Sequence, residues 1–208
     1  MIALVGSEGS MGKRYRAILN KLNVEFRPFD KETSLNDLVS TCKYSNGIIL
    51  CTPTPTHFTF LNALIPLGKP ILCEKPISKD PEEVIECFRL AGEENCSLTM
   101  MLQYQEILTP GEYSGDSSYN YFRTGNDGLV WDCMQTIALA KGKVSVKNDS
   151  PIWECQINGE KLDFRQMDSA YLIAVRKWLY GMSLQKPIEI IEMHQKTKAY
   201  AESYYGNN

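Results

Sequence analysis

The chain has 208 residues, of which 43% are hydrophobic, and its formal net charge is −3. This length can bury one large core, or one ordinary domain and a smaller one. The lack of a basic excess argues against nucleic acid as a partner. No apolar run approaches the ~18 residues of a membrane span, and the apolar start lacks a basic n-region. We therefore expect a cytoplasmic protein without a signal peptide.

The cysteines are odd in number, scattered and mostly set in apolar runs, which is typical of small buried hydrophobes in a reducing compartment. None has C-x-x-C spacing, and the chain has only two histidines, so the sequence predicts no metal site. The seven cysteines are Cys42, Cys51, Cys73, Cys87, Cys96, Cys133 and Cys155.

A glycine-rich turn follows a first apolar strand at residues 2–5 and precedes a helix, which is the context of a dinucleotide-binding fingerprint. The glycines would let the backbone approach a pyrophosphate at the helix N-terminus. The spacing is G-x-x-G-x-x-G instead of G-x-G-x-x-G, and the alternative is a turn without a ligand. The expected cofactor contacts are Gly6, Gly9, Ser10, Met11 and Gly12.

Residues 24–29 form the second expected strand, and Asp30 stands at its end about 20 residues beyond the glycines. An acidic residue in this place usually binds the ribose hydroxyls. Its carboxylate would repel a 2′-phosphate, so we expect NAD, although the neighbouring Lys31 leaves NADP open. The alternative role for Asp30 is to cap the turn before Ser34.

The third strand, residues 48–51, runs into Thr-Pro-Thr-Pro-Thr, and the two prolines predict a stiff loop that leaves the sheet. Thr56 is expected to cap the following helix, which Gly68 ends. The fourth strand, residues 70–73, ends in Glu74-Lys75-Pro76. Ligands bind at the carboxyl ends of parallel strands, so both loops should open onto one crevice.

These two loops resemble those of the glucose-fructose oxidoreductase and inositol dehydrogenase family, abbreviated Gfo/Idh/MocA. In that family a strand ends in T-P-x-x-x-H, a helix ends in G-K, and the next strand ends in E-K-P with a catalytic lysine. The alternative is that E-K-P is only a turn after a strand. The matching residues are Thr52, Pro53, His57, Gly68, Lys69, Glu74, Lys75 and Pro76.

The resemblance implies an NAD(P)-dependent oxidoreductase that acts on a sugar or polyol-like CH–OH group, with Lys75 as catalytic acid or base. Whether the chain forms a homo-oligomer is left open. Family members have a larger second domain than this shortened form can hold, and that domain carries their usual oligomer face. Its cofactor contacts would add Thr52, Pro53, Thr54, His57, Glu74 and Lys75 to the glycine loop and Asp30.

The expected fold is α/β: a Rossmann-type doubly wound parallel sheet over residues 1–104, with a small, truncated α+β domain over 105–184. A helix over 185–205 is expected to pack back on the first domain. Asp80 should cap a helix before a strand at 97–102, and the turn-rich run 109–118 marks the domain junction. The second domain should hold strands at 119–123, 144–146 and 153–157, the last two as a hairpin-like pair, and helices at 128–140 and 168–180.

The expected helix 128–140 fits the family motif G-x-x-x-D-x-x-x-H with Gly128 and Asp132, but Thr136 replaces the histidine. Thr136 cannot accept a proton near neutral pH, so Lys75 remains the candidate acid or base. The resemblance places Asp132 near the substrate as a second catalytic candidate, and its alternative is an ordinary helix residue satisfied by a neighbouring donor. His57 is expected to shape the nicotinamide pocket. His194 is expected to be a solvated surface histidine.

Two functions of different classes remain open. The first is the oxidoreductase, which the retained Glu74-Lys75-Pro76 and Asp132 favour. The second is a cofactor-binding protein without turnover, used for sensing or assembly, which Thr136 and the short second domain favour. A third interpretation, the dihydrodipicolinate reductase type, is suggested by G-x-x-G-x-M-G but lacks that family's His-His segment.

Overall fold

The computed structural model describes residues 1–108, 115–121, 128–148, 150, 152–182 and 185–206. The chain divides into two compact units. The first comprises Met1–Met101 and Ala174–Pro187, and the second comprises Leu102–Ile173 and Ile188–Asn208.

The first unit is built on a parallel five-stranded sheet in the order β2-β1-β3-β4-β5. In its register Leu4 lies opposite Ile49, and Ile49 lies opposite Leu72, which confirms the expected parallel arrangement of these strands. These three side chains are fully buried, as in a sheet covered on both faces. The strands are β1 (Ile2–Val5), β2 (Phe26–Phe29), β3 (Gly47–Leu50), β4 (Ile71–Cys73) and β5 (Leu98–Met100).

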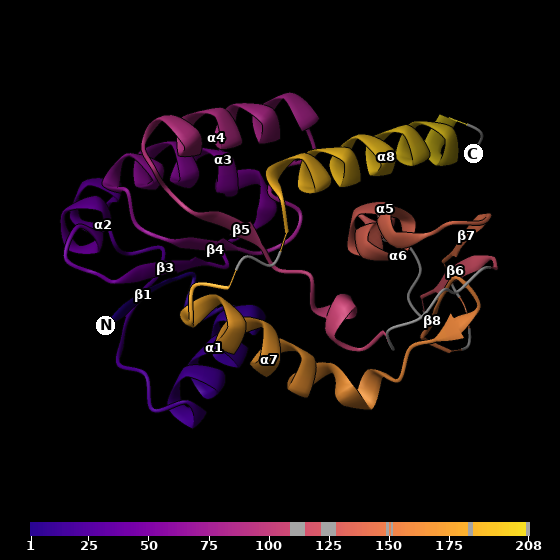
Figure 1. Ribbon diagram of the computed structural model, residues 1–208, viewed down its shortest axis with the longest axis horizontal. Coiled ribbons are helices and arrows are strands. Elements are labelled where there is room, and N and C mark those ends of the chain that lie inside the picture. Colours follow the sequence, from indigo (N-terminus) through magenta and orange to yellow (C-terminus); the bar gives the residue numbers. More distant parts are fainter. Residues whose placement is uncertain (109–114, 122–127, 149, 151, 183–184, 207–208) are drawn as a thin grey trace. The chain divides into compact units, whose positions relative to one another are not determined.

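Helices cover both faces of this sheet: Figure 1 shows α3 and α4 on one face and α1 on the other. The chain order reverses between β1 and β3, which is the switch point where open α/β sheets bind ligands. The expected doubly wound Rossmann fold is thereby confirmed. The helices are α1 (Ser10–Lys21), α2 (Leu35–Cys42), α3 (Thr54–Leu64) with the 3₁₀ turn η1 (Ile65–Leu67), and α4 (Pro81–Glu93).

The helix starts in the first unit follow their capping residues. Asp80 accepts a hydrogen bond from the Glu82 amide and begins α4, as expected. The expectation that Thr56 caps α3 was wrong, because α3 begins at Thr54 after Pro53 and Thr56 lies inside its first turn. Proline is accepted in the first helical turn, where its missing N–H is not needed.

The second unit contains a four-stranded sheet in the order β7-β6-β8-β9. Strand β6 pairs parallel with β7 and antiparallel with β8, so the expected pairing of residues 144–146 with 153–157 was wrong. The Asn158-Gly159 turn, with φ of 51° and 87°, joins β8 to β9 as expected. The strands are β6 (Ser117–Asn120), β7 (Val144–Lys147), β8 (Glu154–Ile157) and β9 (Glu160–Lys161). Residues 109–114 of the expected junction and 122–123 of the expected strand lie outside the described residues.

The expected helix 128–140 is broken in two. Helix α5 (Leu129–Asp132) ends at Cys133, whose φ of −93° and ψ of 16° are not helical, and α6 (Met134–Leu139) follows. Helix α6 lies against β6 and β8. The core of this unit comprises Tyr104, Tyr119, Leu129, Val130, Cys133, Ile137, Val146, Cys155, Ile157, Leu162 and Ala201.

The last two long helices, α7 (Met167–Leu179) and α8 (Pro187–Gly206), lie close to the expected positions. Residues 174–187, which include the end of α7, group with the first unit, while α8 from Ile188 groups with the second. The packing of the C-terminal helix on the first domain stays a prediction. The remaining 3₁₀ turns are η2 (Gln103–Glu106) and η3 (Phe164–Gln166).

All seven cysteines are buried and free, as expected from their apolar surroundings. Burial raises the pKa of the Cys42 thiol to about 11, so it stays neutral and behaves as a small apolar side chain. Among the helices that the structure describes, none is both long and apolar enough to cross a membrane.

The expectation of a solvated His194 was wrong, because the side chain is fully buried in α8. Its Nδ1 lies 2.7 Å from the carbonyl oxygen of Ile190, and its ring lies near Trp131. Burial lowers the pKa of His194 from 6.5 to about 4, with the hydrogen bond to Ile190 acting in the opposite direction. The folded chain therefore holds this imidazole neutral at mildly acidic pH.

We expect acid to destabilise the protein through His194. As the pH falls from 6.5 toward 4, the unfolded chain binds a proton at this residue and the folded chain does not. The free energy of unfolding should fall by about 3 kcal/mol over this pH window. Above pH 6.5, His194 should have no effect on it. Urea unfolding at a series of pH values measures the slope, with His194→Gln as control. Equal slopes in both proteins would contradict the assignment.

Candidate active site

The glycine loop leaves β1 in a conformation that only glycine accommodates. Gly6 has φ of +91°, and a Cβ there would lie 2.8 Å from the backbone of Cys51 and Thr52. A Cβ on Gly12 would lie 2.1 Å from the Gly6 carbonyl oxygen. The loop therefore packs backbone against backbone, as a phosphate-binding turn requires.

The start of α1 is open for an anion. Its N-cap is Gly9, so no side chain occupies the amides of the first turn, in contrast to α2 and α4. The expected contacts Ser10, Met11 and Gly12 form this turn. Backbone N–H groups and the helix dipole together favour a phosphate in such a position.

Asp30 is tied to the glycine loop. Its Oδ2 accepts a hydrogen bond from the Glu8 amide at 2.7 Å, and its Oδ1 accepts one from the Lys31 amide at 2.9 Å. These bonds, the Glu8 bond first, hold the pKa of Asp30 below its ordinary value. The alternative role as helix cap is filled by Ser34, which accepts from the Asp37 amide.

A pocket with a volume of about 460 Å³ lies between the glycine loop, the end of β2 and the start of α3. The lining includes five residues expected at the cofactor: Gly6, Gly9, Asp30, Thr52 and Pro53. It also includes apolar residues that sequence reasoning missed, among them Leu38 and Phe60. Phe60 could have been found from its position two helical turns after Pro53.

The E-K-P loop is anchored by a buried hydrogen bond. Tyr15, fully buried in α1, donates from its hydroxyl to Oε1 of Glu74 at 2.7 Å. The other oxygen, Oε2, accepts the Lys75 amide at 3.1 Å, and the Lys75-Pro76 peptide bond is cis. Sequence reasoning placed Tyr15 only on the apolar side of its helix. Its position one turn after the glycine loop is the signal that could have revealed the contact.

His57 lies between the two loops. Its side chain is 1% exposed, Nδ1 lies 2.8 Å from the Pro76 carbonyl oxygen, and Nε2 lies 2.7 Å from the Thr52 carbonyl oxygen. Both ring nitrogens therefore face backbone carbonyls, and neither is left for a substrate. Thr54, the remaining expected contact, is the first residue of α3.

The helix motif of the second unit does not present one functional face. Residues four apart share a helix face, but the break at Cys133 separates Asp132 from Thr136. Thr136 is fully buried, with its Oγ1 3.0 Å from the Sγ of Cys155, whereas Asp132 is exposed at the end of α5. The two catalytic candidates come from different units: Lys75 from the first, Asp132 from the second.

Gln103 and Gln135 form a buried pair in the second unit. Gln135 donates from Nε2 to the Oε1 of Gln103 at 2.9 Å and accepts the Tyr104 amide at 2.9 Å. This pair ties η2, which follows β5, to α6. Within the described parts of the chain, no three His, Cys, Asp or Glu side chains gather to hold a metal ion.

Residues 4–102 match the model of a family described as "Oxidoreductase family, NAD-binding Rossmann fold". Among curated proteins, the chain is similar to inositol 2-dehydrogenase of Rhizobium meliloti (strain 1021), with 32% identity over 62 residues, which are 30% of this chain and 19% of that protein. It is also similar to inositol 2-dehydrogenase 1 of Mycolicibacterium vanbaalenii, with 42% identity over 48 residues, 23% of this chain and 14% of that protein. The aligned stretches thus span about a fifth or less of these relatives.

Solved structures resemble the whole chain. The WlbA (WbpB) dehydrogenase of Thermus thermophilus, in complex with NAD and UDP-GlcNAcA, has a TM-score of 0.75 and 14% identity over 96% of this chain and 94% of that chain. A myo-inositol dehydrogenase of Corynebacterium glutamicum has a TM-score of 0.71 and 14% identity over 99% of this chain and 96% of that chain. At such identities the likeness shows the fold alone.

Proposed function

We propose that the chain is an NAD-dependent oxidoreductase, because residues 4–102 match the model of the oxidoreductase family with an NAD-binding Rossmann fold. Its reaction would move a hydride between the cofactor and a hydroxyl or carbonyl carbon of a sugar-like or polyol-like substrate. Lys75 would be the acid or base of this reaction.

The observation that carries this proposal is the anchoring of the E-K-P loop. Tyr15 fixes Glu74, and His57 lies between the Pro76 and Thr52 carbonyls, so the loop that bears Lys75 is tied to the loop that lines the cofactor pocket. Such rigid support is what a proton-transfer group needs, because its rate depends on position.

The residues of the first unit fit NAD. Gly6 and Gly12 give the close backbone approach, the open turn of α1 offers amides to the pyrophosphate, and Asp30 offers acceptors to ribose hydroxyls. The bound nicotinamide would supply the hydride acceptor or donor. Lys75 would then take the proton from the substrate hydroxyl, or return it to the carbonyl oxygen, through its Nζ.

The substrate class rests on the relatives. The aligned curated proteins are inositol 2-dehydrogenases, and the WlbA dehydrogenase was solved with UDP-GlcNAcA. A ring with several hydroxyl groups is common to these molecules. We propose that Asp132, exposed at the end of α5, accepts hydrogen bonds from such hydroxyls.

A specific observation favours a second candidate, a cofactor-binding protein without turnover. Thr136 stands where the family motif has histidine. It is fully buried and forms a hydrogen bond with Cys155 inside the core. A screen of inositols, free sugars and nucleotide sugars, followed by the absorbance of reduced nicotinamide, separates the two candidates. Turnover of any of them supports the oxidoreductase. Tight NADH binding with no turnover supports the second candidate, and no NADH binding contradicts both.

We expect the chain to bind NAD(H) more tightly than NADP(H). Asp30 would accept ribose hydroxyl protons and repel a 2′-phosphate. Asp30→Ala should weaken NADH binding by about 2 kcal/mol, roughly thirtyfold, since it removes hydrogen bonds to a charged group. Calorimetric titration of both cofactors measures this. The matched control is Glu25→Ala, an exposed carboxylate outside the pocket lining, which should leave both affinities unchanged. Equal affinities for both cofactors in the wild type would show that Asp30 does not discriminate between NAD(H) and NADP(H).

A further inference from the structure

A second pocket lies at the opposite edge of the first unit's sheet from the glycine loop. Residues at the amino ends of all five strands and at the end of α7 line it, and its volume is about 430 Å³. A volume in this range is typical of small-molecule sites. The proposed reaction uses the carboxyl ends of the strands, so this pocket has no role in it.

Trp178 forms the wall of this pocket and is held firmly. Its side chain is 6% exposed, and its ring lies over Gly47 at the start of β3. A Cβ on residue 47 would lie 2.9 Å from a ring carbon of Trp178, so a larger residue would displace the ring. The indole therefore packs closely on the start of β3.

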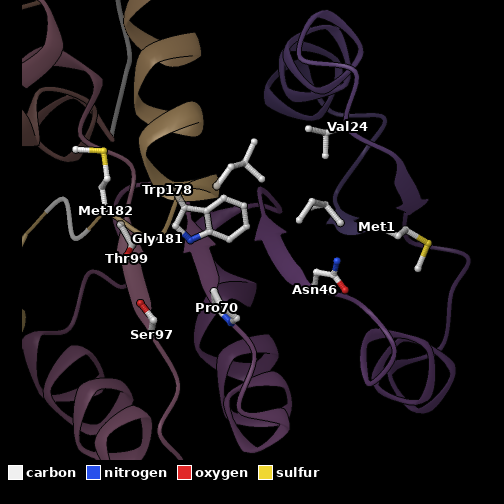
Figure 2. Close-up of a pocket in the computed structure, with 11 residues that line it drawn as sticks. Met1, Val24, Asn46, Pro70, Ser97, Thr99, Trp178, Gly181 and Met182 are labelled. Carbon is white, nitrogen blue, oxygen red and sulfur yellow. The ribbon is translucent and has the colours of Figure 1, made fainter.

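The indole nitrogen lacks an acceptor. Nε1 of Trp178 is buried and has no hydrogen-bond partner among the residues that the structure describes. Leaving a buried donor unpaired costs about 1–3 kcal/mol, and few such groups occur in native proteins. Figure 2 shows this nitrogen on the side of the ring turned toward Thr99 and Ser97, whose hydroxyls line the same pocket.

The rest of the lining defines the chemistry of a ligand. All of the lining side chains are neutral, and most are apolar, with Asn46, Ser97 and Thr99 as the polar ones. A cationic ligand would find no counter-charge among these residues and would lose hydration. Met182, which is 54% exposed, is an unbranched side chain that can move aside and adapt to a ring.

We propose that this pocket binds a neutral, planar molecule that carries a carbonyl group. The carbonyl oxygen accepts the hydrogen bond from Nε1 of Trp178, and the ring packs on the apolar lining. Aromatic amides and lactams have this chemistry. Nε1 is buried in the free protein, so neighbouring side chains move aside when the ligand enters. The ligand's carbonyl oxygen then accepts the hydrogen bond from Nε1.

The test uses the indole N–H signals of the ¹⁵N-labelled full-length chain, which has three tryptophans. The probe is 2-quinolone, a neutral bicyclic lactam, and Trp178→Phe identifies the Trp178 signal. We expect 2-quinolone to shift this signal in a saturable way and to leave those of Trp131 and Trp153, which belong to the second unit, in place. The cationic analogue, 4-(aminomethyl)-2-quinolone, should cause no shift.

Two further variants make the outcome decisive. Trp178→Phe keeps a smaller aromatic ring and removes the donor, and should raise the dissociation constant of 2-quinolone about tenfold by ligand-observed NMR. Ser97→Tyr should fill the pocket and abolish the shift while the Trp178 signal stays dispersed. Saturating NADH should not change the shift of the wild type. No shift of Trp178, equal shifts of all three signals, an unchanged affinity in Trp178→Phe, or displacement by NADH would each overturn the proposal.

Discussion

Replacement of Lys75 by methionine is expected to abolish turnover of whatever substrate the screen identifies, with little change in NADH affinity. Hydride can leave an alcohol carbon only while a base takes the hydroxyl proton. Positioned proton transfer contributes about 10²–10⁴ in rate. Thr136 is buried against Cys155 and takes no part, so this contribution falls on Lys75. Methionine keeps much of the side-chain bulk and removes the amine.

The matched control is Lys79→Met, which removes an exposed amine four residues further along the chain. It should leave kcat and NADH affinity unchanged. Initial rates and a fluorescence titration of NADH measure the two quantities separately. Surviving turnover in Lys75→Met would show that another group transfers the proton. A parallel loss of NADH affinity would assign Lys75 to cofactor binding instead of chemistry.

Gly12→Ala is expected to have the largest effect on stability and cofactor binding of any conservative change in the glycine loop. The added Cβ would lie 2.1 Å from the Gly6 carbonyl oxygen and 2.5 Å from the Ser7 carbonyl carbon. These are backbone atoms, so the loop itself must move. The cost should reach about 3 kcal/mol or more, at the upper end for overpacking. The displaced loop should also weaken NADH binding.

Gly92→Ala provides the control for this change. Gly92 lies in α4, and a Cβ there would meet no atom within 4 Å beyond its chain neighbours and the backbone of its own helix. The substitution should stabilise the protein by about 0.5–1 kcal/mol, since alanine favours the helix. Urea unfolding and NADH titration of both variants measure the contrast. A Gly12→Ala protein as stable as the wild type would mean that the loop can widen at no cost.

The first unit could be predicted from the sequence because its signals are local. Strands β1, β3 and β4 are apolar runs, as at Ile48–Leu50, and the loops after β3 and β4 fall at the ends of such runs. The glycine loop, Asp30 and Pro53 were placed for the same reason. The contact of Tyr15 with Glu74 was missed, since it joins residues 59 positions apart and only the place of Tyr15 one turn after the glycine loop hints at it.

The second unit was less predictable because its pairing is not local. The expected hairpin placed β7 beside β8, whereas β6, which precedes both by a long connection, lies between them. The break at Cys133 carries no glycine or proline signal, so a single helix was the natural expectation. The burial of His194 had a signal that was missed: Ile190, His194, Thr197 and Ala201 recur at helical spacing and all face inward.

The hydrogen bond between Tyr15 and Glu74 has a consequence for how this sequence can diverge. Neither partner can change freely. Phenylalanine at position 15 would leave a buried carboxylate oxygen of Glu74 without this donor, and an apolar residue at position 74 would leave the buried Tyr15 hydroxyl without this acceptor. The two positions should therefore be replaced together among descendants of this chain. A library randomised at both sites should return pairs that match in donor and acceptor, and few single replacements.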